Sequence, residues 1–471
     1  MPFQFKPTQL PPDFYTPQRP QPVATPQILV FNQDLADTLG LDPTDDWASV
    51  LSGNTVQAGS TPFAQAYAGH QFGHFTRLGD GRAVMLGEHV TPQGVRLDIQ
   101  LKGAGPTPYA RGGDGRAALG PVLREYLVSE AMHYLGIPTT RSLAAVSTGE
   151  WVQRDTALPG AILTRVAASH LRIGTVSYAA LQSQAHSESL VQYALDRHNM
   201  MHGDDAPAVQ LLRGVIDRQV DLIIQWMRVG FIHGVMNTDN TAISGETLDY
   251  GPCAFLDAYD PMAVFSAIDT HGRYAFGNQP AIAQWNCSRL AQALRPCLAD
   301  HSDTAQSSAA DLVGAYADLH QTRWLAMMRA KLGLLDTDPT DRALITDLLD
   351  WMRTTQADYT LTFRYLSGGD IPEYTQYHDP DFIAWHTRWR ARVSAMPVDQ
   401  VQAFMQTQNP AVIPRNHIIE RVLAAAYQGD MAPFFDALAV FKTPYIQTDA
   451  SRAYERPPHA HERVYYTYCG T

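Results

Sequence analysis

The sequence predicts an α+β protein in which a β-rich N-terminal lobe with one key helix precedes an enlarged helical C-terminal lobe. Two observations predict this order. Between Gly79 and about Val166, short apolar segments alternate with turn signals, whereas long helical patterns dominate after about Thr175. No fixed-period repeat occurs, and no stretch of flexible composition separates the two halves. We therefore expect two lobes that follow each other without a linker.

Composition excludes several classes of protein. The chain has 471 residues, of which 45% are hydrophobic and 17% charged, so it is expected to fold and to bury a large core. A net charge of -12 argues against a nucleic-acid binder or a binder of anionic membranes, so any phosphate-bearing partner must be met locally. No apolar run approaches the roughly 18 residues of a membrane span. The proline-rich N-terminus does not resemble a signal peptide, so we expect a cytoplasmic protein.

The clearest predicted strand runs from Val95 to Lys102. Apolar and polar residues alternate along it, so Lys102 ends the polar face of a half-buried strand. A second strand pair is predicted over residues 142–146 and 151–154, around the turn signal Thr148-Gly149, followed by a strand over 161–166.

The key helix of the first lobe is predicted over Leu119–Leu135. Its apolar residues form an approximate stripe, Gly136 and Pro138 end it, and Glu125 points off the stripe toward a neighbouring element. In the second lobe, helical patterns cover residues 210–229, 311–332, 341–365 and 418–428.

These patterns divide the chain into four parts. We predict an N-terminal extended arm and lead-in lying on the domain surface (1–60), a β-rich N-lobe (61–175), a helical C-lobe (176–455), and a C-terminal tail that contains Cys469 (456–471).

The densest polar cluster lies between residues 230 and 260. In the kinase catalytic loop, H-R-D-x-x-x-x-N, the Asn follows the His by seven places, and Asn240 stands in that relation to His233. The later sequence Asp249-Tyr-Gly resembles the second metal-binding motif of kinases. The position of the kinase catalytic Asp holds Val235, and the nearest carboxylate is Asp239, so either the base has moved or catalysis is lost. Alternatively, these residues only cap a turn.

The residues that precede this loop follow the same order along the chain as the corresponding residues of protein kinases. Lys102 ends a strand and precedes Glu125 on a helix, as a kinase strand lysine precedes the glutamate that orients it. Arg165 and Arg172 suit phosphate oxygens, although surface ion pairs are the commoner explanation for two arginines. The glycine-rich stretches 78–82 and 112–117 can approach phosphates through their backbone, or the first can be a simple hairpin turn. The sequence therefore favours a protein-kinase-like fold.

The whole assembly resembles the selenoprotein O family of kinase-fold proteins. The runs that carry the resemblance are Tyr67–Gly73, Leu78–Arg82, Gln100–Tyr109, Arg111–Ala117, His233–Asn240, Asp249–Pro252, Phe276–Pro280 and Asn409–His417.

This resemblance implies protein adenylylation, in which AMP moves from ATP to a Ser, Thr or Tyr hydroxyl of another protein or of the chain itself. It implies Mg²⁺ or Mn²⁺ as the metal and an ATP held in reverse relative to kinases. Its implied site residues are Gly79, Gly81 and Arg82 as the glycine-rich loop, Lys102 with its supporting partner Glu125, Asp114, Gly115, Arg165 and Arg172 as the nucleotide pocket, Asp239 as proton acceptor, and Asn240 and Asp249 as metal ligands.

Two alternatives remain open at this stage. One is a manganese-dependent transfer of UMP from UTP, and the other is a noncatalytic ATP-binding scaffold, which Val235 would favour if the base is lost. Protein phosphorylation is disfavoured by the same residue.

The four cysteines, Cys253, Cys287, Cys297 and Cys469, are widely spaced and include no CxxC pair, which indicates neither a disulfide framework nor a zinc cluster. Some members of the resembled family carry selenocysteine near the C-terminus, and Cys469 is similarly placed. That similarity implies a redox or regulatory thiol, the alternative being an ordinary thiol in a mobile tail. The sequence does not identify its partner.

Overall fold

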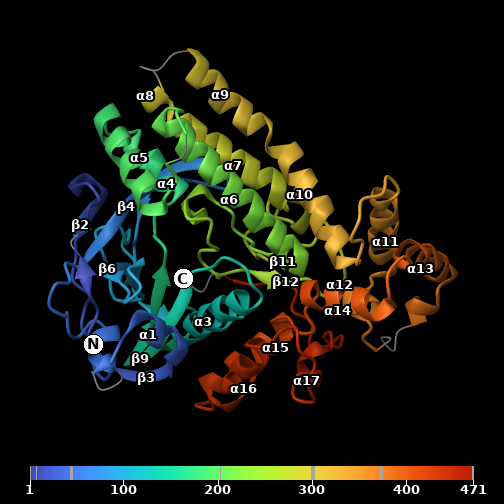
Figure 1. The fold of residues 1–471 in the computed structure, drawn as a ribbon. Helices are drawn as coiled ribbons and strands as arrows, with labels where there is room; N and C mark the ends of the chain where they lie inside the picture. Colours follow the sequence, from blue (N-terminus) through green and yellow to red (C-terminus); the bar gives the residue numbers. More distant parts are fainter. Residues whose placement is uncertain are drawn as a thin grey trace.

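The computed structural model describes residues 2–6, 8–42, 46–201, 203–298, 303–370 and 375–468. A large antiparallel sheet fills the N-terminal part, and helices form the rest of the chain (Figure 1). The predicted α+β organisation is therefore confirmed. Among the described residues, no helix combines the length and the apolar content that crossing a bilayer would require.

The main path of the sheet has the strand order β2-β4-β6-β7-β10-β9-β3, and three further strands pair beside it. In chain order the strands are β1 (Phe5–Lys6), β2 (Tyr15–Pro17), β3 (Gln27–Phe31), β4 (Phe63–Gln71), β5 (His74–Gly79), β6 (Ala83–Val90), β7 (Arg96–Lys102), β8 (Ala117–Ala118), β9 (Arg141–Gln153) and β10 (Ala157–Ala167). Lys102 pairs with Ala83 on one side and Leu163 on the other, so it lies on a central strand.

The N-terminal segment is more than a surface arm. Its strands β1, β2 and β3 pair with β6, β4 and β9, and it also forms the short helices α1 (Gln33–Leu39) and α2 (Trp47–Leu51). Phe14 and Val30 are buried there, because apolar residues between the prolines pack into the core.

The strand predicted from Val95 is present as β7, but the expectation that it is half-buried is wrong, because Asp98 and Gln100 of its polar face are buried within the sheet. The pair predicted over 142–146 and 151–154 is wrong, because both segments belong to the single strand β9. Gly149 has a φ of +70°, and the register with β10 shifts around Gly160. The turn signal therefore produces a bulge inside a strand, since β10 continues to pair on both sides of it.

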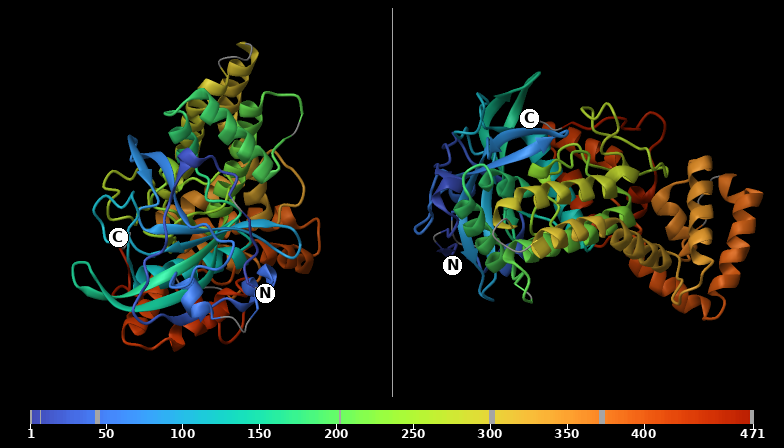
Figure 2. Two further views of the ribbon diagram at one scale, coloured as in Figure 1. Left: turned by 90° about the vertical axis from the view of Figure 1, so that its left-hand side faces the viewer. Right: turned by 90° about the horizontal axis from the view of Figure 1, so that it is seen from above.

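The predicted key helix is α3 (Leu119–Tyr134), which ends just before Gly136 at a φ of +76° and packs against β9 and β10. The second lobe contains α4 (Ile173–Ala179), α5 (Gln184–His198), α6 (Pro207–Val229), α7 (Gln279–Ala293), α8 (Arg295–Leu298), α9 (Asp303–Gly314), α10 (Tyr316–Lys331), α11 (Asp341–Thr355), α12 (Tyr359–Leu366), α13 (Pro380–Val393), α14 (Val398–Gln408), α15 (Asn416–Tyr427), α16 (Ala432–Phe441) and α17 (Arg452–Glu455). Figure 2 shows α11 and α13, in orange, projecting away from the sheet.

Two of the predicted helices are each divided in the structure. The prediction over 311–332 begins in α9 and continues as α10. The prediction over 341–365 is split into α11 and α12, because Gln356 has a φ of +55° and the Asp358 carboxylate accepts the Leu361 N–H at 2.8 Å, which starts a new helix. The helices predicted over 210–229 and 418–428 are present as α6 and α15.

Candidate active site

The loop after α6 supplies the predicted catalytic residues. It contains β11 (Phe231–Ile232), a short 3₁₀ turn over Thr238–Asn240, and β12 (Ala254–Phe255). The buried His233 ring contacts the Leu248 carbonyl at 3.0 Å, which ties the two halves of the loop together. Asp249 adopts a φ of +69°, a conformation that is unfavourable for a residue other than glycine and is typical of functional loops.

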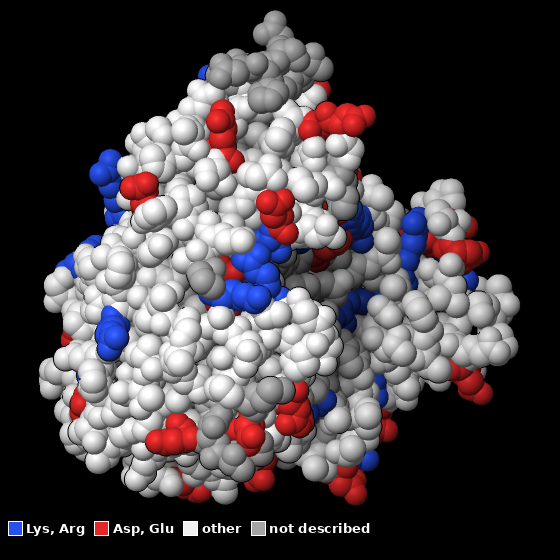
Figure 3. Space-filling view, turned by 60° about the vertical axis from the view of Figure 1, so that its left-hand side comes forward, with Lys and Arg blue, Asp and Glu red and all other residues white. Residues whose placement is uncertain are grey.

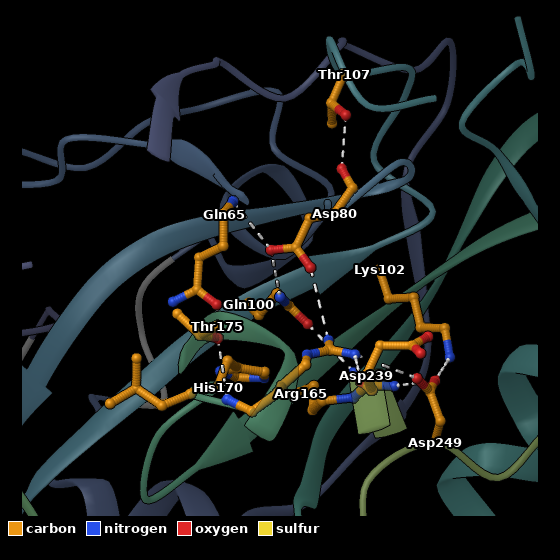
Figure 4. Close-up of polar contacts among 12 residues, drawn as sticks. Gln65, Asp80, Gln100, Lys102, Thr107, Arg165, His170, Thr175, Asp239 and Asp249 are labelled. Atoms are coloured by element: carbon orange, nitrogen blue, oxygen red, sulfur yellow. Dashed lines mark hydrogen bonds and ion pairs between the residues drawn. The ribbon is translucent and has the colours of Figure 1, made fainter. Parts of the chain in front are cut away.

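A compact cluster of charges joins the two lobes. Lys102 Nζ lies 2.6 Å from Glu125 Oε2 and also binds Asp249 Oδ1. Arg165 Nη2 lies 2.8 Å from the same Asp249 oxygen (Figure 4). Arg165 Nε also donates to Glu125 Oε1 at 3.0 Å. The predicted pairing of Lys102 with Glu125 is thus confirmed as a contact, and Arg165 is an additional member of the cluster.

The two carboxylates of this cluster are held in the charged form. Burial alone would raise the pKa of Asp249, but Lys102, Arg165 and Arg172 hold it well below its ordinary value. Burial likewise opposes the charge of Glu125, yet Arg165 and Lys102 lower its pKa. Oδ2 of Asp249 remains 4.0 Å from Arg172 Nη1, so this oxygen is available to a ligand.

Arg172 connects the glycine-rich loop with the catalytic loop. Its Nη1 donates to the main-chain oxygen of Asp239 at 2.6 Å, and its Nη2 lies 3.6 Å from Asp80 Oδ1. The guanidinium also stacks over the Tyr67 ring at 4.6 Å from the ring centre. These contacts fix the guanidinium of Arg172 within a buried site.

Asp239 is the carboxylate in the loop with the fewest partners. Asp239 is 6% exposed; among the described residues its Oδ1 has no hydrogen-bond partner, and its Oδ2 accepts only a long bond of 3.4 Å from Gln71 Nε2. Burial raises its pKa above the ordinary value. The neighbouring Asn240 donates its side-chain N–H to the Val235 carbonyl at 3.1 Å.

Two adjoining cavities meet at this cluster. One has a volume of about 860 Å³ and the other about 470 Å³, and Tyr67, Arg82, Lys102 and Asp249 line both. The larger is also lined by Glu125, Asp239 and Asn240, and the smaller by Gly79, Gly81, Asp114, Gly115, Arg165 and Arg172. Every site residue predicted within the described part of the chain therefore lines at least one of the two cavities.

The smaller cavity is rich in cations. Besides Lys102 and the three predicted arginines Arg82, Arg165 and Arg172, its lining includes Arg111, Arg116 and Arg154. On the face drawn in Figure 3, Lys and Arg side chains gather beside a hollow near the centre of the view. Because guanidinium groups bind phosphate oxygens in bidentate fashion, this cavity suits a polyphosphate.

The second glycine-rich loop is shaped by Asp114 and Gly115. The Asp114 carboxylate binds Arg154 through two contacts of 2.8 and 3.1 Å, so it positions an arginine of the smaller cavity. Gly115 has a φ of +64°, and a Cβ there would lie 2.1 Å from the carbonyl carbon of Gly105. Only glycine fits this close approach of two loops.

Sequence reasoning missed four residues of the site: Tyr67, Gln71, Asp80 and Arg154. Tyr67, Gln71 and Asp80 lie inside the runs that carry the family resemblance, which was the available signal. Arg154 follows β9 and had no motif of its own. Their contacts with Arg172, Asp239 and Asp114 join segments that are remote in sequence.

The donor set fits a hard divalent cation such as Mg²⁺ or Mn²⁺. Asp249 Oδ2 has no partner closer than 4.0 Å, and Asn240 uses only its N–H group within the described residues. No cluster of three or more His, Cys, Asp or Glu side chains suited to a metal occurs in that same part of the chain. Two protein oxygens are the typical contribution to a magnesium site completed by phosphates and water.

The C-terminal tail reaches the larger cavity. Val464, Tyr466, Thr467 and Tyr468 line it, and Thr467 is held by bonds from its Oγ1 to the Pro252 carbonyl at 2.6 Å and from its N–H to the Phe265 carbonyl at 2.7 Å. The tail therefore packs against the loop that carries Asp249.

The redox prediction for Cys469 lies outside the described residues. The other three cysteines are free and buried, and burial raises the thiol pKa of Cys253, of Cys287 to about 12 and of Cys297 to about 11. Such thiols are poorly reactive. The redox role of Cys469 stays a prediction, because this residue lies outside the described part of the chain.

Comparison with known proteins gives consistent matches over nearly the whole chain. Residues 2–442 match a family described as protein adenylyltransferase SelO. Proteins named protein nucleotidyltransferase YdiU from Brevibacillus brevis and Nitrosococcus oceani are each 52% identical, over 98% of this chain and 96% of the relative. The protein of that name from Halalkalibacterium halodurans is also 52% identical, over 100% of this chain and 97% of the relative.

Proposed function

The chain belongs to the SelO family and is a nucleotidyltransferase, and on this premise we propose that it transfers AMP from ATP to Ser, Thr or Tyr hydroxyls of proteins. Membership confirms the predicted resemblance and the kinase-like fold, and it contradicts the alternative of a noncatalytic scaffold. The observation that carries the proposal is the Asp239 carboxylate on the wall of the larger cavity, beside the cationic smaller one.

We propose that ATP lies with its terminal phosphates in the smaller cavity. Arg165 and Arg172 are buried on its wall, where their charges would meet the β- and γ-phosphates. The α-phosphate would then lie where the two cavities meet, beside Lys102 and Asp249, which line both. Of the three phosphates it would be the closest to Asp239. A kinase orientation would instead bring the γ-phosphate to the base.

The transfer step follows from this placement. The acceptor oxygen forms a bond to the α-phosphorus as the bond from that phosphorus to the pyrophosphate oxygen breaks, and the hydroxyl proton passes to the Asp239 carboxylate. The electron pair leaves with pyrophosphate, whose charge Lys102 and Arg172 offset. Asn240 and Asp249 would hold Mg²⁺ or Mn²⁺, which when bound screens the phosphate charge. A positioned general base typically accelerates such a step about 10²- to 10⁴-fold.

The chain itself is a proposed acceptor, in addition to other proteins. Tyr466 and Tyr468 line the same cavity as Asp239 and are 63% and 70% exposed, and Thr467 between them anchors the tail. Tyr465 offers a comparison, since it is exposed but does not line that cavity. Peptide mapping after incubation with nucleotide should find modification at Tyr466 or Tyr468 before Tyr465.

One experiment tests the nucleotide donor, the orientation of the bound ATP and the role of Asp239 as general base. The purified protein is incubated with Mg²⁺ or Mn²⁺ and with ATP or UTP, and intact mass distinguishes adducts of AMP, UMP and phosphate. We expect AMP adducts, label from α-labelled but not from γ-labelled ATP, and no transfer by Asp239→Asn, which should still bind ATP. Labelling from the γ-position would overturn the orientation, and UMP adducts alone would favour the uridylyltransferase alternative.

A further inference from the structure

The hairpin of β4 and β5 has no role in the transfer step described above, although its tip lies directly on the catalytic loop. Three consecutive tip residues bond to three consecutive loop residues. The bonds are His70 N–H to Thr238 Oγ1 at 2.7 Å, Gln71 Nε2 to Asp239 Oδ2 at 3.4 Å, and Phe72 N–H to Asn237 Oδ1 at 3.0 Å. The hairpin belongs to the sheet and the loop to the helical lobe, so these bonds cross between lobes.

The approach between the two segments is close enough to require glycine. A Cβ on Gly69 would lie 2.3 Å from Asp239 Oδ1, nearer than any real side chain allows. The tip is itself held in place, because the Phe72 ring packs edge-on against Tyr274 at 5.2 Å, and the Tyr274 hydroxyl donates to Asn237 Oδ1 at 2.6 Å. The hairpin tip and the catalytic loop therefore form one packed unit.

Within this unit, Gln71 is the only tip residue among those described whose side-chain bond reaches the Asp239 carboxylate. Its amide donates to Oδ2, while Oδ1 is buried against Gly69 and has no hydrogen-bond partner among the described residues, so the two oxygens of the carboxylate are unequal. Rotation of an aspartate carboxylate about its last torsion is soft, so a donor on one oxygen restricts which oxygen is presented to a ligand.

We propose that Gln71 is a positioning residue that holds Asp239 Oδ2 toward the larger cavity, where the second lone pair of this oxygen receives the proton of the acceptor hydroxyl. This inference rests on the proposed function, in which Asp239 is the proton acceptor. Among the described residues, Gln71 belongs to the lining of the larger cavity and not to that of the smaller one, so its loss should affect the transfer step and not the binding of the phosphates.

The test uses three variants of nearly constant length. Gln71→Met keeps the approximate shape and removes the hydrogen-bond donor to Asp239. Gln71→Glu replaces that donor with a carboxylate of the same charge as Asp239, and Gln71→Lys restores a donor. We expect kcat to fall about tenfold in Gln71→Met, to fall further in Gln71→Glu, and to recover at least partly in Gln71→Lys, with the KM for ATP unchanged in Gln71→Met. The matched control His74→Ala removes an exposed side chain from the same hairpin and should leave kcat unchanged.

Thermal unfolding of each variant separates positioning from folding, because a structural role would lower kcat and the unfolding temperature together. Wild-type kcat in Gln71→Met, no recovery in Gln71→Lys, or an effect on KM alone would each overturn the proposal. The parallel variant Asp239→Asn distinguishes a failure of the positioning role of Gln71 from a failure of the base role of Asp239. If it abolishes transfer while Gln71→Met does not, the positioning role fails and the base stands; if it retains transfer, the proposed base itself fails.

Discussion

Replacing Glu246 by Gln should stabilise the protein at alkaline pH and leave its stability nearly unchanged at acidic pH. Glu246 lies in the loop between Asn240 and Asp249. Its carboxylate accepts the N–H of Ala168, directly after β10, at 3.2 and 3.0 Å, and the Ser244 hydroxyl at 2.8 Å. Glutamine can accept the same N–H, so the variant keeps the link between the catalytic loop and the segment that joins the lobes.

The size and sign of the effect follow from the pKa of Glu246. Burial raises this pKa from 4.5 to about 7, with smaller opposing effects of the Ser244 and Ala168 bonds. The folded state therefore binds the proton more tightly than the unfolded state, so wild-type stability is highest below pH 4.5 and falls as pH rises through about 7. At roughly 1.4 kcal/mol per unit, the loss reaches about 3 kcal/mol.

The assay is urea unfolding of wild type and Glu246→Gln at a series of pH values, without nucleotide or metal. The two proteins should have similar free energies of unfolding near the acidic end, and the variant should be more stable by up to about 3 kcal/mol above neutral pH. Glu188→Gln, at an exposed position of α5, controls for the loss of one negative charge. A variant less stable than wild type at alkaline pH would show that the fold prefers the charged carboxylate, and the reasoning would be refuted.

Three further predictions concern the site. Asp249→Ala should abolish transfer and remove its response to added Mg²⁺ or Mn²⁺, while the fold persists because Glu125 still pairs with Lys102; unchanged activity in a metal titration would remove the metal-site assignment. Arg172→Lys should weaken ATP binding about tenfold or more, measured by calorimetry, because the bidentate fork is lost; equal affinity would place the phosphates elsewhere. Cys469→Ser should keep basal transfer under reducing conditions, and loss of that activity would show that the thiol takes part in catalysis.

Local sequence patterns were sufficient where the structure is itself local. Strand β7 and helix α3 follow from alternation and from an apolar stripe, which predict the type and approximate bounds of each element, although the structure buries both faces of β7 and nearly every residue of α3 up to Met132. Motif spacing likewise singled out Asn240 and Asp249, which line the larger cavity and whose metal-binding role stays a prediction, and it predicted the contact of Lys102 with Glu125. The order of these residues along the chain corresponds to a known arrangement, so no geometry was needed to name them.

Only the tertiary structure decided features that depend on distant partners. Helices α11 and α12 separate at Asp358, whose carboxylate also binds Arg415 at a separation of 57 residues, a partner that no periodicity shows. The bond from Gln71 to Asp239 spans 168 residues and forms because packing of the two lobes brings a hairpin tip onto a loop. Side-chain pattern determines which face an element buries, whereas the contact between two loops depends on how whole lobes pack, and that packing is set by the entire core.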